Sequence, residues 1–159
     1  DRRPEDVYGL SKVCSEEIAR TVARRHGVSV TTIRPATVFG PDRTPARPTE
    51  ENVDLGSDMA GGDFGSYVDV RDLVGMIEAA LATDHDGHEP VNCVADENYL
   101  GRPTAEIVAA ICGGLPGSCD IEGGEAALSN ARAADLLDWT PQYPDPIGDE
   151  ATASEPTWV

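Results

Sequence analysis

The sequence carries very little positive charge for its size. Of its 159 residues, 12 are Lys or Arg and 29 are Asp or Glu, so the formal net charge is −17 at pH 7. A protein that binds nucleic-acid phosphates needs a basic patch, and an anionic membrane surface selects for basic segments in the same way. The charge balance therefore disfavours nucleic acids and acidic membrane surfaces as partners.

The sequence also lacks the cysteine spacings of a metal site and the apolar runs of a membrane protein. Its four cysteines show no C-x-x-C spacing and no histidine at metal-ligand spacing; they are Cys14, Cys93, Cys112 and Cys119. They are typical of core or surface residues in a reducing compartment, so we expect no metal and a cytoplasmic location. No apolar run approaches the roughly twenty residues of a membrane-spanning helix, and no signal peptide is visible.

An initiator methionine is missing, because the sequence opens on the charged residues Asp1-Arg2-Arg3. That start is typical of an interior point of a longer protein, or of a processed end. The length is sufficient for one domain with its own core and short for two. We therefore expect one compact unit or a piece of a larger protein.

Lysine is scarce: eleven of the twelve cations are arginine, and the only lysine is Lys12. We interpret the acidic composition as halophilic, because high net charge maintains solubility in a salt-rich cytoplasm and salt screens the self-repulsion. A stability maximum at low salt would contradict this hypothesis. A lysine kept where arginine is otherwise used indicates a need for a compact, titratable ammonium, although chance is the alternative.

Lys12 belongs to a segment, residues 4–26, that is predicted to be helical. Pro4 and Gly27 stand where a helix usually begins and ends, and apolar residues recur every three or four positions. The apolar positions are Val7, Leu10, Cys14, Ile18 and Val22, and the charged positions, which require no function, are Glu16, Glu17, Arg20, Arg24 and Arg25. Tyr8 precedes Lys12 by four residues, so both lie on one helical face, where the ammonium favours the phenolate of a proton-transfer catalyst. An amphipathic helix with an exposed lysine is the alternative interpretation.

A β-branched run follows directly, at residues 28–33, and predicts a buried strand that ends at Arg34-Pro35. A helix followed at once by such a strand is half of a βαβ unit. It favours a parallel α/β sheet, whose ligands lie outside the carboxyl ends of the strands. We therefore expect a ligand at the loop of residues 35–41.

The remainder of the chain continues the mixture of helices and strands. Residues 42–66 are predicted to form an acidic connector or lid, in which Arg43 meets an anionic substrate group or, as the alternative, pairs with local carboxylates. The next expected elements are an extended piece at 66–68 and a helix at 70–81, which Asp69 caps and whose inward residues are Leu73, Val74, Ile77 and Leu81. A strand at 90–95 and a helix at 104–112, capped by the Thr104 hydroxyl, follow. The last are a short strand at 118–121, a helix at 129–137 and a loosely ordered acidic tail at 144–159.

Four segments together resemble the C-terminal part of the extended short-chain dehydrogenase/reductase family, also called the NAD-dependent epimerase/dehydratase family. Residues 8–12, Tyr-Gly-Leu-Ser-Lys, resemble its catalytic Tyr-x-x-x-Lys, and residues 34–41 resemble the loop after its sixth strand. Residues 67–74 are similar to its Val-Asp-Val-x-Asp stretch, and residues 136–141 to its closing Leu-Gly-Trp-x-Pro, with Asp138 in place of the usual glycine. The resemblance covers about residues 4–143.

The resemblance implies an α/β fold, the C-terminal part of a Rossmann-like doubly wound parallel sheet with a small substrate-binding portion. It divides the chain into the end of the Rossmann-like domain (1–41), the connector (42–66), a substrate-side portion (67–143) and the tail (144–159). The family's Gly-rich turn and its catalytic Ser or Thr upstream of the tyrosine are not present, and residues 61–65, Gly-Gly-Asp-Phe-Gly, do not replace the turn. We therefore expect an incomplete chain that is inactive alone.

By the same resemblance, Tyr8 is the acid and base of a hydride-transfer reaction with NAD or NADP, and Lys12 favours its phenolate and binds the nicotinamide ribose. The segment from Pro35 to Val38 borders the nicotinamide, and Thr37 and Arg43 are candidates for substrate contact. The short connector favours a dehydrogenase of a sugar or sugar derivative. The alternatives are a nucleotide-sugar 4-epimerase or dehydratase, and a non-catalytic remnant or interaction module. A homodimer is expected for the intact enzyme.

Overall fold

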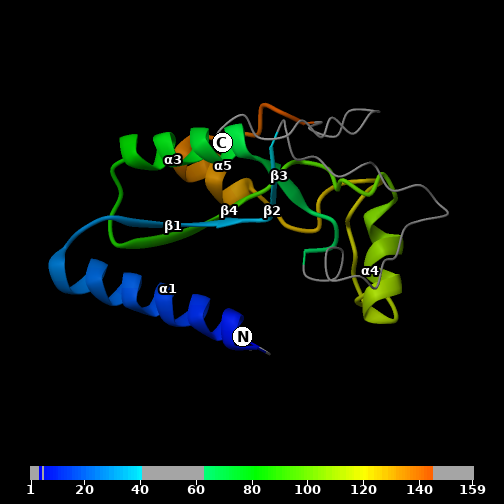
Figure 1. The fold of residues 1–159 in the computed structure, drawn as a ribbon, viewed down its shortest axis with the longest axis horizontal. Helices are drawn as coiled ribbons and strands as arrows, with labels where there is room; N and C mark the ends of the chain where they lie inside the picture. Colours follow the sequence, from blue (N-terminus) through cyan, green and yellow to red (C-terminus); the bar gives the residue numbers. More distant parts are fainter. Residues whose placement is uncertain (1–3, 5, 41–62, 145–159) are drawn as a thin grey trace, which may run out of the picture.

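A computed structural model describes residues 4, 6–40 and 63–144 of the chain. Its elements, in order, are α1 (Val7–His26), β1 (Val30–Pro35), β2 (Thr37–Phe39), β3 (Tyr67–Asp69), α3 (Val70–Ala82), β4 (His88–Cys93), α4 (Thr104–Cys112) and α5 (Ala131–Leu137). Figure 1 shows α1 on one side of the β1 and β4 strands, α3 and α5 on the other, and α4 at the far end of the molecule. The connector of residues 42–66, apart from residues 63–66, and the tail, apart from Pro144, lie outside the described residues.

Both strand pairs are parallel, which confirms the predicted fold class. β1 pairs with β4 from Val30 opposite His88 to Pro35 opposite Cys93, and β2 pairs with β3. β2 corrects one expectation, because residues 37–39 were predicted to belong to a loop. Its hydrogen-bonding partner is some thirty residues further along the chain, so no local pattern indicates it. The predicted boundary between residues 1–41 and 67–143 stays a prediction, since each pair joins one strand from either side.

The helix ends follow their local signals with two exceptions. α1 begins at Val7, three residues later than predicted, because the Asp6 carboxylate accepts a hydrogen bond from Gly9 N (2.6 Å). Gly27 ends α1 in the left-handed conformation (φ 63°), and Asp69 caps α3, as predicted. Thr104 does not cap α4, however: its hydroxyl donates to the Glu125 carbonyl, and Pro103 holds the N-cap position.

The short strand predicted at residues 118–121 is wrong. These residues form no strand, and the extended pairing in this region is a single bridge between Glu97 and Glu125. The Asn98 amide stabilises the turn beside the bridge by donating to the carbonyls of Arg102 and Gly124 and to the Thr104 hydroxyl. The segment is therefore held by side-chain to backbone bonds instead of a ladder.

The core lies between the strands and the helices α3, α4 and α5. One cluster contains Phe39, Tyr67, Ala95, Tyr99, Leu100 and Ile107, and a second contains Val68, Met76, Val91, Cys93, Ala133, Leu137 and Trp139. The two clusters meet at β3, whose consecutive residues Tyr67 and Val68 point to opposite faces. β3 is buried on both faces, as is typical of a parallel strand.

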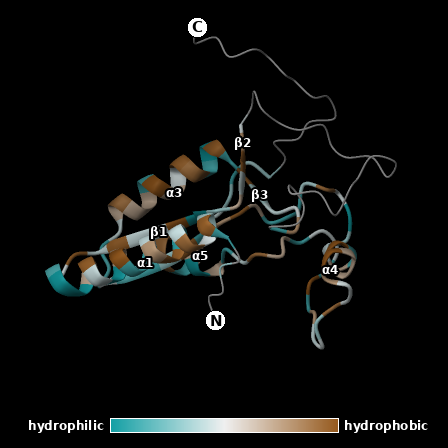
Figure 2. Ribbon diagram, turned by 60° about the horizontal axis from the view of Figure 1, so that its bottom comes forward, coloured by the Kyte–Doolittle hydropathy of each residue, from teal (hydrophilic) through white to brown (hydrophobic). Residues whose placement is uncertain are grey.

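The buried face of α3 differs from the predicted one. Leu73 is half-buried, but Val74, Ile77 and Leu81 are 49, 44 and 84% exposed, whereas Met76 is fully buried. The five apolar positions predicted for α1 are also exposed, and Ala23 is the one buried residue of that helix. Figure 2 shows hydrophobic residues distributed along both helices. The periodicity thus predicts helix correctly but does not indicate which face packs on the sheet. None of the helices within residues 4, 6–40 and 63–144 is long and apolar enough to cross a membrane.

Candidate active site

Tyr8 and Lys12 lie side by side on the first turns of α1. The Lys12 Nζ is 4.9 Å from the centroid of the Tyr8 ring, within the range of a cation–π contact. The Tyr8 side chain is accessible, with 69% of its surface exposed. The i, i+4 spacing therefore brings the phenol and the ammonium together as predicted, while their catalytic role stays a prediction.

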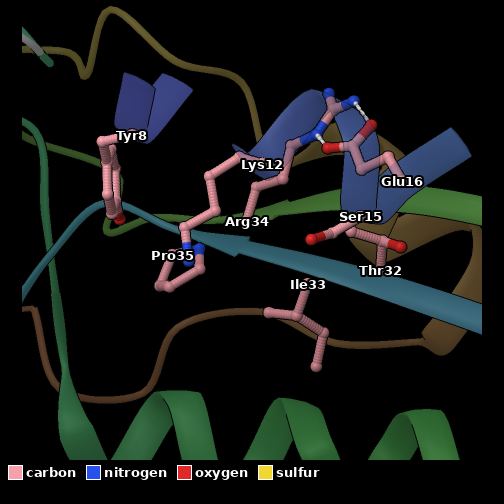
Figure 3. A pocket seen from close by; sticks show the side chains of 8 residues that line it. All are labelled: Tyr8, Lys12, Ser15, Glu16, Thr32, Ile33, Arg34 and Pro35. Atoms are coloured by element: carbon pink, nitrogen blue, oxygen red, sulfur yellow. Dashed lines mark hydrogen bonds and ion pairs between the residues drawn. The ribbon is translucent and has the colours of Figure 1, made fainter. Parts of the chain in front are cut away.

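These two side chains border a cavity of about 330 Å³ between α1 and β1 (Figure 3). Its walls are Tyr8, Lys12, Ser15, Glu16, Thr32, Ile33, Arg34 and Pro35. Pro35 is the last residue of β1, so the cavity reaches the carboxyl end of that strand. Ligands of parallel α/β sheets bind at such ends, and the ligand expected at residues 35–41 stays a prediction.

An ion pair between helix and strand forms one wall of the cavity. Arg34 Nε and Nη2 donate to Glu16 Oε1 and Oε2, both at 2.7 Å, so the guanidinium binds the carboxylate with two parallel hydrogen bonds. The hydrogen bond to Glu16 raises the pKa of Arg34. Glu16 is not indicated as a site residue by the sequence pattern, in which it is one of the charges that require no function. The one available signal was its position, a single turn after Lys12.

Thr37 and Val38, two further predicted site residues, are not in the cavity wall. Val38 lies on β2 beside Val68 of β3 and is 43% exposed. Thr37 donates to Asp63 Oδ2 from both its backbone N (3.1 Å) and its Oγ1 (2.7 Å). Its hydroxyl proton is therefore engaged within the protein. Arg43 lies outside the described residues.

Asp63 is a second residue that no sequence motif indicates. Its Oδ2 holds Thr37, while its Oδ1 is buried and has no hydrogen-bond partner within the described part of the chain. Burial raises the pKa of Tyr99, and the charge of Asp63 raises it further. Asp63 thus anchors the start of β2 from a segment that is 26 residues away in sequence.

The two later segments of the family resemblance contact each other. Asp72 of α3 accepts hydrogen bonds from Gln142 N (2.8 Å) and Tyr143 N (3.1 Å), and its carbonyl accepts one from Trp139 Nε1. Asp138, which replaces the usual glycine, has φ of 52°, the left-handed conformation that glycine adopts at least cost. The structure therefore explains why a glycine is usual there.

Asp69 is buried and pairs with a neighbour. It accepts hydrogen bonds from Arg71 N, Nε and Nη2, each at 2.8 Å. Burial acts to raise the pKa of Asp69, but the hydrogen bonds from Arg71 outweigh it and hold the pKa below its ordinary value. The Arg71 guanidinium also lies 3.7 Å from the centroid of the Tyr143 ring. This pair belongs to the scaffold at the junction of β3 and α3.

The described residues hold no group of three or more His, Cys, Asp or Glu that could bind a metal ion. All four cysteines, each within the described part, are free thiols. Burial raises the pKa of Cys93 to about 12, which keeps its thiol protonated.

These features describe a parallel α/β protein with its candidate site at the carboxyl end of β1. The sequence profile of the NAD dependent epimerase/dehydratase family matches residues 1–93, and the chain belongs to that family. No curated protein matches the chain by sequence.

Solved structures with a similar fold include a UDP-galactose 4-epimerase, which is 24% identical in sequence with a TM-score of 0.55. Another is RMD from Pseudomonas aeruginosa complexed with NADPH, which is 18% identical with a TM-score of 0.56. The matches cover 95% of this chain in both cases, and 54% and 56% of the respective solved chains. The chain thus spans about half the length of the structures it matches.

Proposed function

We propose that this chain supplies the tyrosine–lysine half of an NAD(P)-dependent oxidoreductase that acts on a sugar or sugar derivative. The observation that carries the proposal is the placement of Tyr8 and Lys12 in one cavity at the carboxyl end of β1. Membership of the family supports the choice of cofactor. The cofactor, when bound, accepts or delivers the hydride.

The residues in the cavity suit a nicotinamide ribose. Its hydroxyl oxygens accept hydrogen bonds, and Lys12 offers an ammonium that forms no ion pair with a carboxylate among the described residues. Tyr8 has its hydroxyl on the accessible side of α1, where it exchanges a proton with a substrate oxygen. Pro35 borders the same space with a side chain that cannot compete for hydrogen bonds. Lys12 therefore binds and orients, while Tyr8 moves the proton.

The test joins the chain to a Gly-rich dinucleotide-binding half and follows NADH absorbance with simple aldoses and uronates. We expect NADH to accumulate, and Tyr8→Phe to lower turnover by about 10²–10⁴-fold with little change in cofactor affinity. Tyr143→Phe, at a tyrosine that is 40% exposed and does not line the cavity, is the matched control and should retain activity. Epimerisation without net NADH would favour the 4-epimerase, and failure to bind NADH would favour the non-catalytic alternative.

We further propose that the intact enzyme is a homodimer that associates through α1. Val7, Leu10, Ile18 and Val22 are 83, 50, 64 and 40% exposed, and they form an apolar stripe on the face away from β1. A continuous exposed apolar patch is typical of an association surface. Ile18→Glu should convert a dimer to a monomer in sedimentation velocity, whereas Leu81→Glu, at an apolar residue of α3 that is 84% exposed, should not. A monomeric wild-type enzyme would contradict the proposal.

A further inference from the structure

Lys12 has two possible partners on α1, one turn away in either direction. Side chains three or four residues apart are neighbours on a helix, and these positions around Lys12 hold Tyr8, Gly9, Ser15 and Glu16. Glu16 is the one acid among them. An ammonium and a carboxylate at i, i+4 attract each other, so Glu16 is the natural competitor of Tyr8 for Lys12.

In the structure, Lys12 contacts Tyr8 and not Glu16. The Lys12 Nζ lies over the Tyr8 ring at 4.9 Å. Both oxygens of Glu16 are bound by Arg34, which reaches across from the end of β1 (Figure 3). The Glu16 side chain is 12% exposed, so the carboxylate is turned into the helix–strand interface.

We propose that Arg34 is a positioning residue for Lys12. By binding both oxygens of Glu16, it prevents Glu16 from pairing with Lys12, so that the ammonium stays against Tyr8. The planar guanidinium is suited to this task because its fork matches the two carboxylate oxygens, which a lysine ammonium cannot do. The catalytic consequence rests on the function proposed above, whereas the placement of Lys12 does not.

The single lysine permits a direct test on the 159-residue chain. Reductive methylation with ¹³C-formaldehyde labels Lys12 and the terminal amine only, and the Tyr8 ring displaces the Lys12 methyl signal in an NMR spectrum. The variant Tyr8→Leu gives the position of the Lys12 methyl signal in the absence of the Tyr8 ring. We expect Arg34→Gln to move the signal to that position, because Glu16 loses its two hydrogen bonds from Arg34 and then attracts Lys12.

The double variant Arg34→Gln with Glu16→Gln separates positioning from simple docking of the helix. It removes the competitor, so we expect the signal to return to the wild-type position. If Arg34 only attached α1 to β1, the double variant would stay displaced, and the proposal would be overturned. An unchanged signal in Arg34→Gln would overturn it equally. Glu17→Gln, which breaks the exposed Glu17–Arg20 pair on the same helix, is the control and should leave the signal unchanged.

Ser15→Glu tests the same competition without altering the ion pair. It adds a carboxylate three residues from Lys12 while Arg34 remains bound to Glu16, so it should also displace the signal; no displacement would count against the proposal. In the joined, active enzyme, Arg34→Gln should lower turnover by about tenfold, and the double variant should restore it. If the joined enzyme shows no turnover at all, the proposed function fails, but the NMR result still decides what places Lys12.

Discussion

Helix α1 and the segment from β3 to Tyr143 are attached to the molecule by different kinds of contact. α1 buries one residue, Ala23, and its bidentate ion pair with β1 lies at the partly exposed cavity. The later segment contributes Met76, Trp139 and the carboxylates of Asp69 and Asp72, all of them buried. Burial of apolar surface is the main stabilising term in folding, and an ion pair whose arginine is 42% exposed adds less.

The difference separates function from stability. The residues with candidate chemistry, Tyr8 and Lys12, lie on an accessible helix, and their replacement should change activity more than folding. The later segment has no candidate catalytic residue in the cavity wall. Substitutions there should act on the free energy of unfolding, and the following experiments test that separation from the largest expected effect to the smallest.

Met76→Ala should lower the free energy of unfolding by about 2–5 kcal/mol, because Met76 is fully buried beside Trp139 and Leu137 and its truncation leaves a cavity. Leu81→Ala, on the same helix but 84% exposed, should change it by less than about 0.5 kcal/mol. Urea denaturation measures both. Equal effects would show that the exposed face of α3 packs against something in solution.

Asp72→Ala should lower the free energy of unfolding by about 1–3 kcal/mol, because the amides of Gln142 and Tyr143 lose their acceptor. Hydrogen exchange of these two amides should accelerate. Asp84→Ala, an exposed aspartate in the loop after α3, is the control and should have little effect. Protected amides in Asp72→Ala would mean that other contacts hold the segment.

Asp138→Val should lower the free energy of unfolding by about 1–2 kcal/mol, because a β-branched residue is strained at φ of 52°. Asp138→Gly should be tolerated, since glycine adopts this conformation without the steric penalty. Thermal denaturation compares the two variants. If the Asp138→Val variant were as stable as the Asp138→Gly variant, the turn after α5 would have to change its conformation.

The smallest expected effect is an acid destabilisation through Asp69. Its folded-state pKa lies below the ordinary value of 3.8, so its stabilising contribution is complete above that pH and is lost as the pH falls through the folded-state pKa. Asp69→Asn should remove this part of the pH dependence, which denaturation between neutral and acidic pH would show. If the free energy of unfolding of the variant depended on pH as that of the wild-type protein does, Asp69 would not be the group responsible. Because Arg71 is partly exposed, we expect a modest contribution.

The predictions from sequence succeeded where the interactions are local. The Gly27 end of α1, the Asp69 cap of α3 and the 104–112 range of α4 depend on neighbouring residues, and all are confirmed. The predictions failed where a distant segment competes. The Thr104 hydroxyl, a good helix cap by its residue type, instead binds Glu125, 21 residues further on.

Sequence by itself determined that Tyr8 and Lys12 share a helical face before a strand that ends at Pro35, because a helix repeats its side-chain directions every three to four residues. Only the tertiary structure decided which partner each charge takes. Arg34 is 18 residues from Glu16, and Asp63 is 26 residues from Thr37, so neither contact follows from spacing. It likewise decided that α1 and α3 expose apolar residues, since periodicity identifies a stripe but not the surface that covers it.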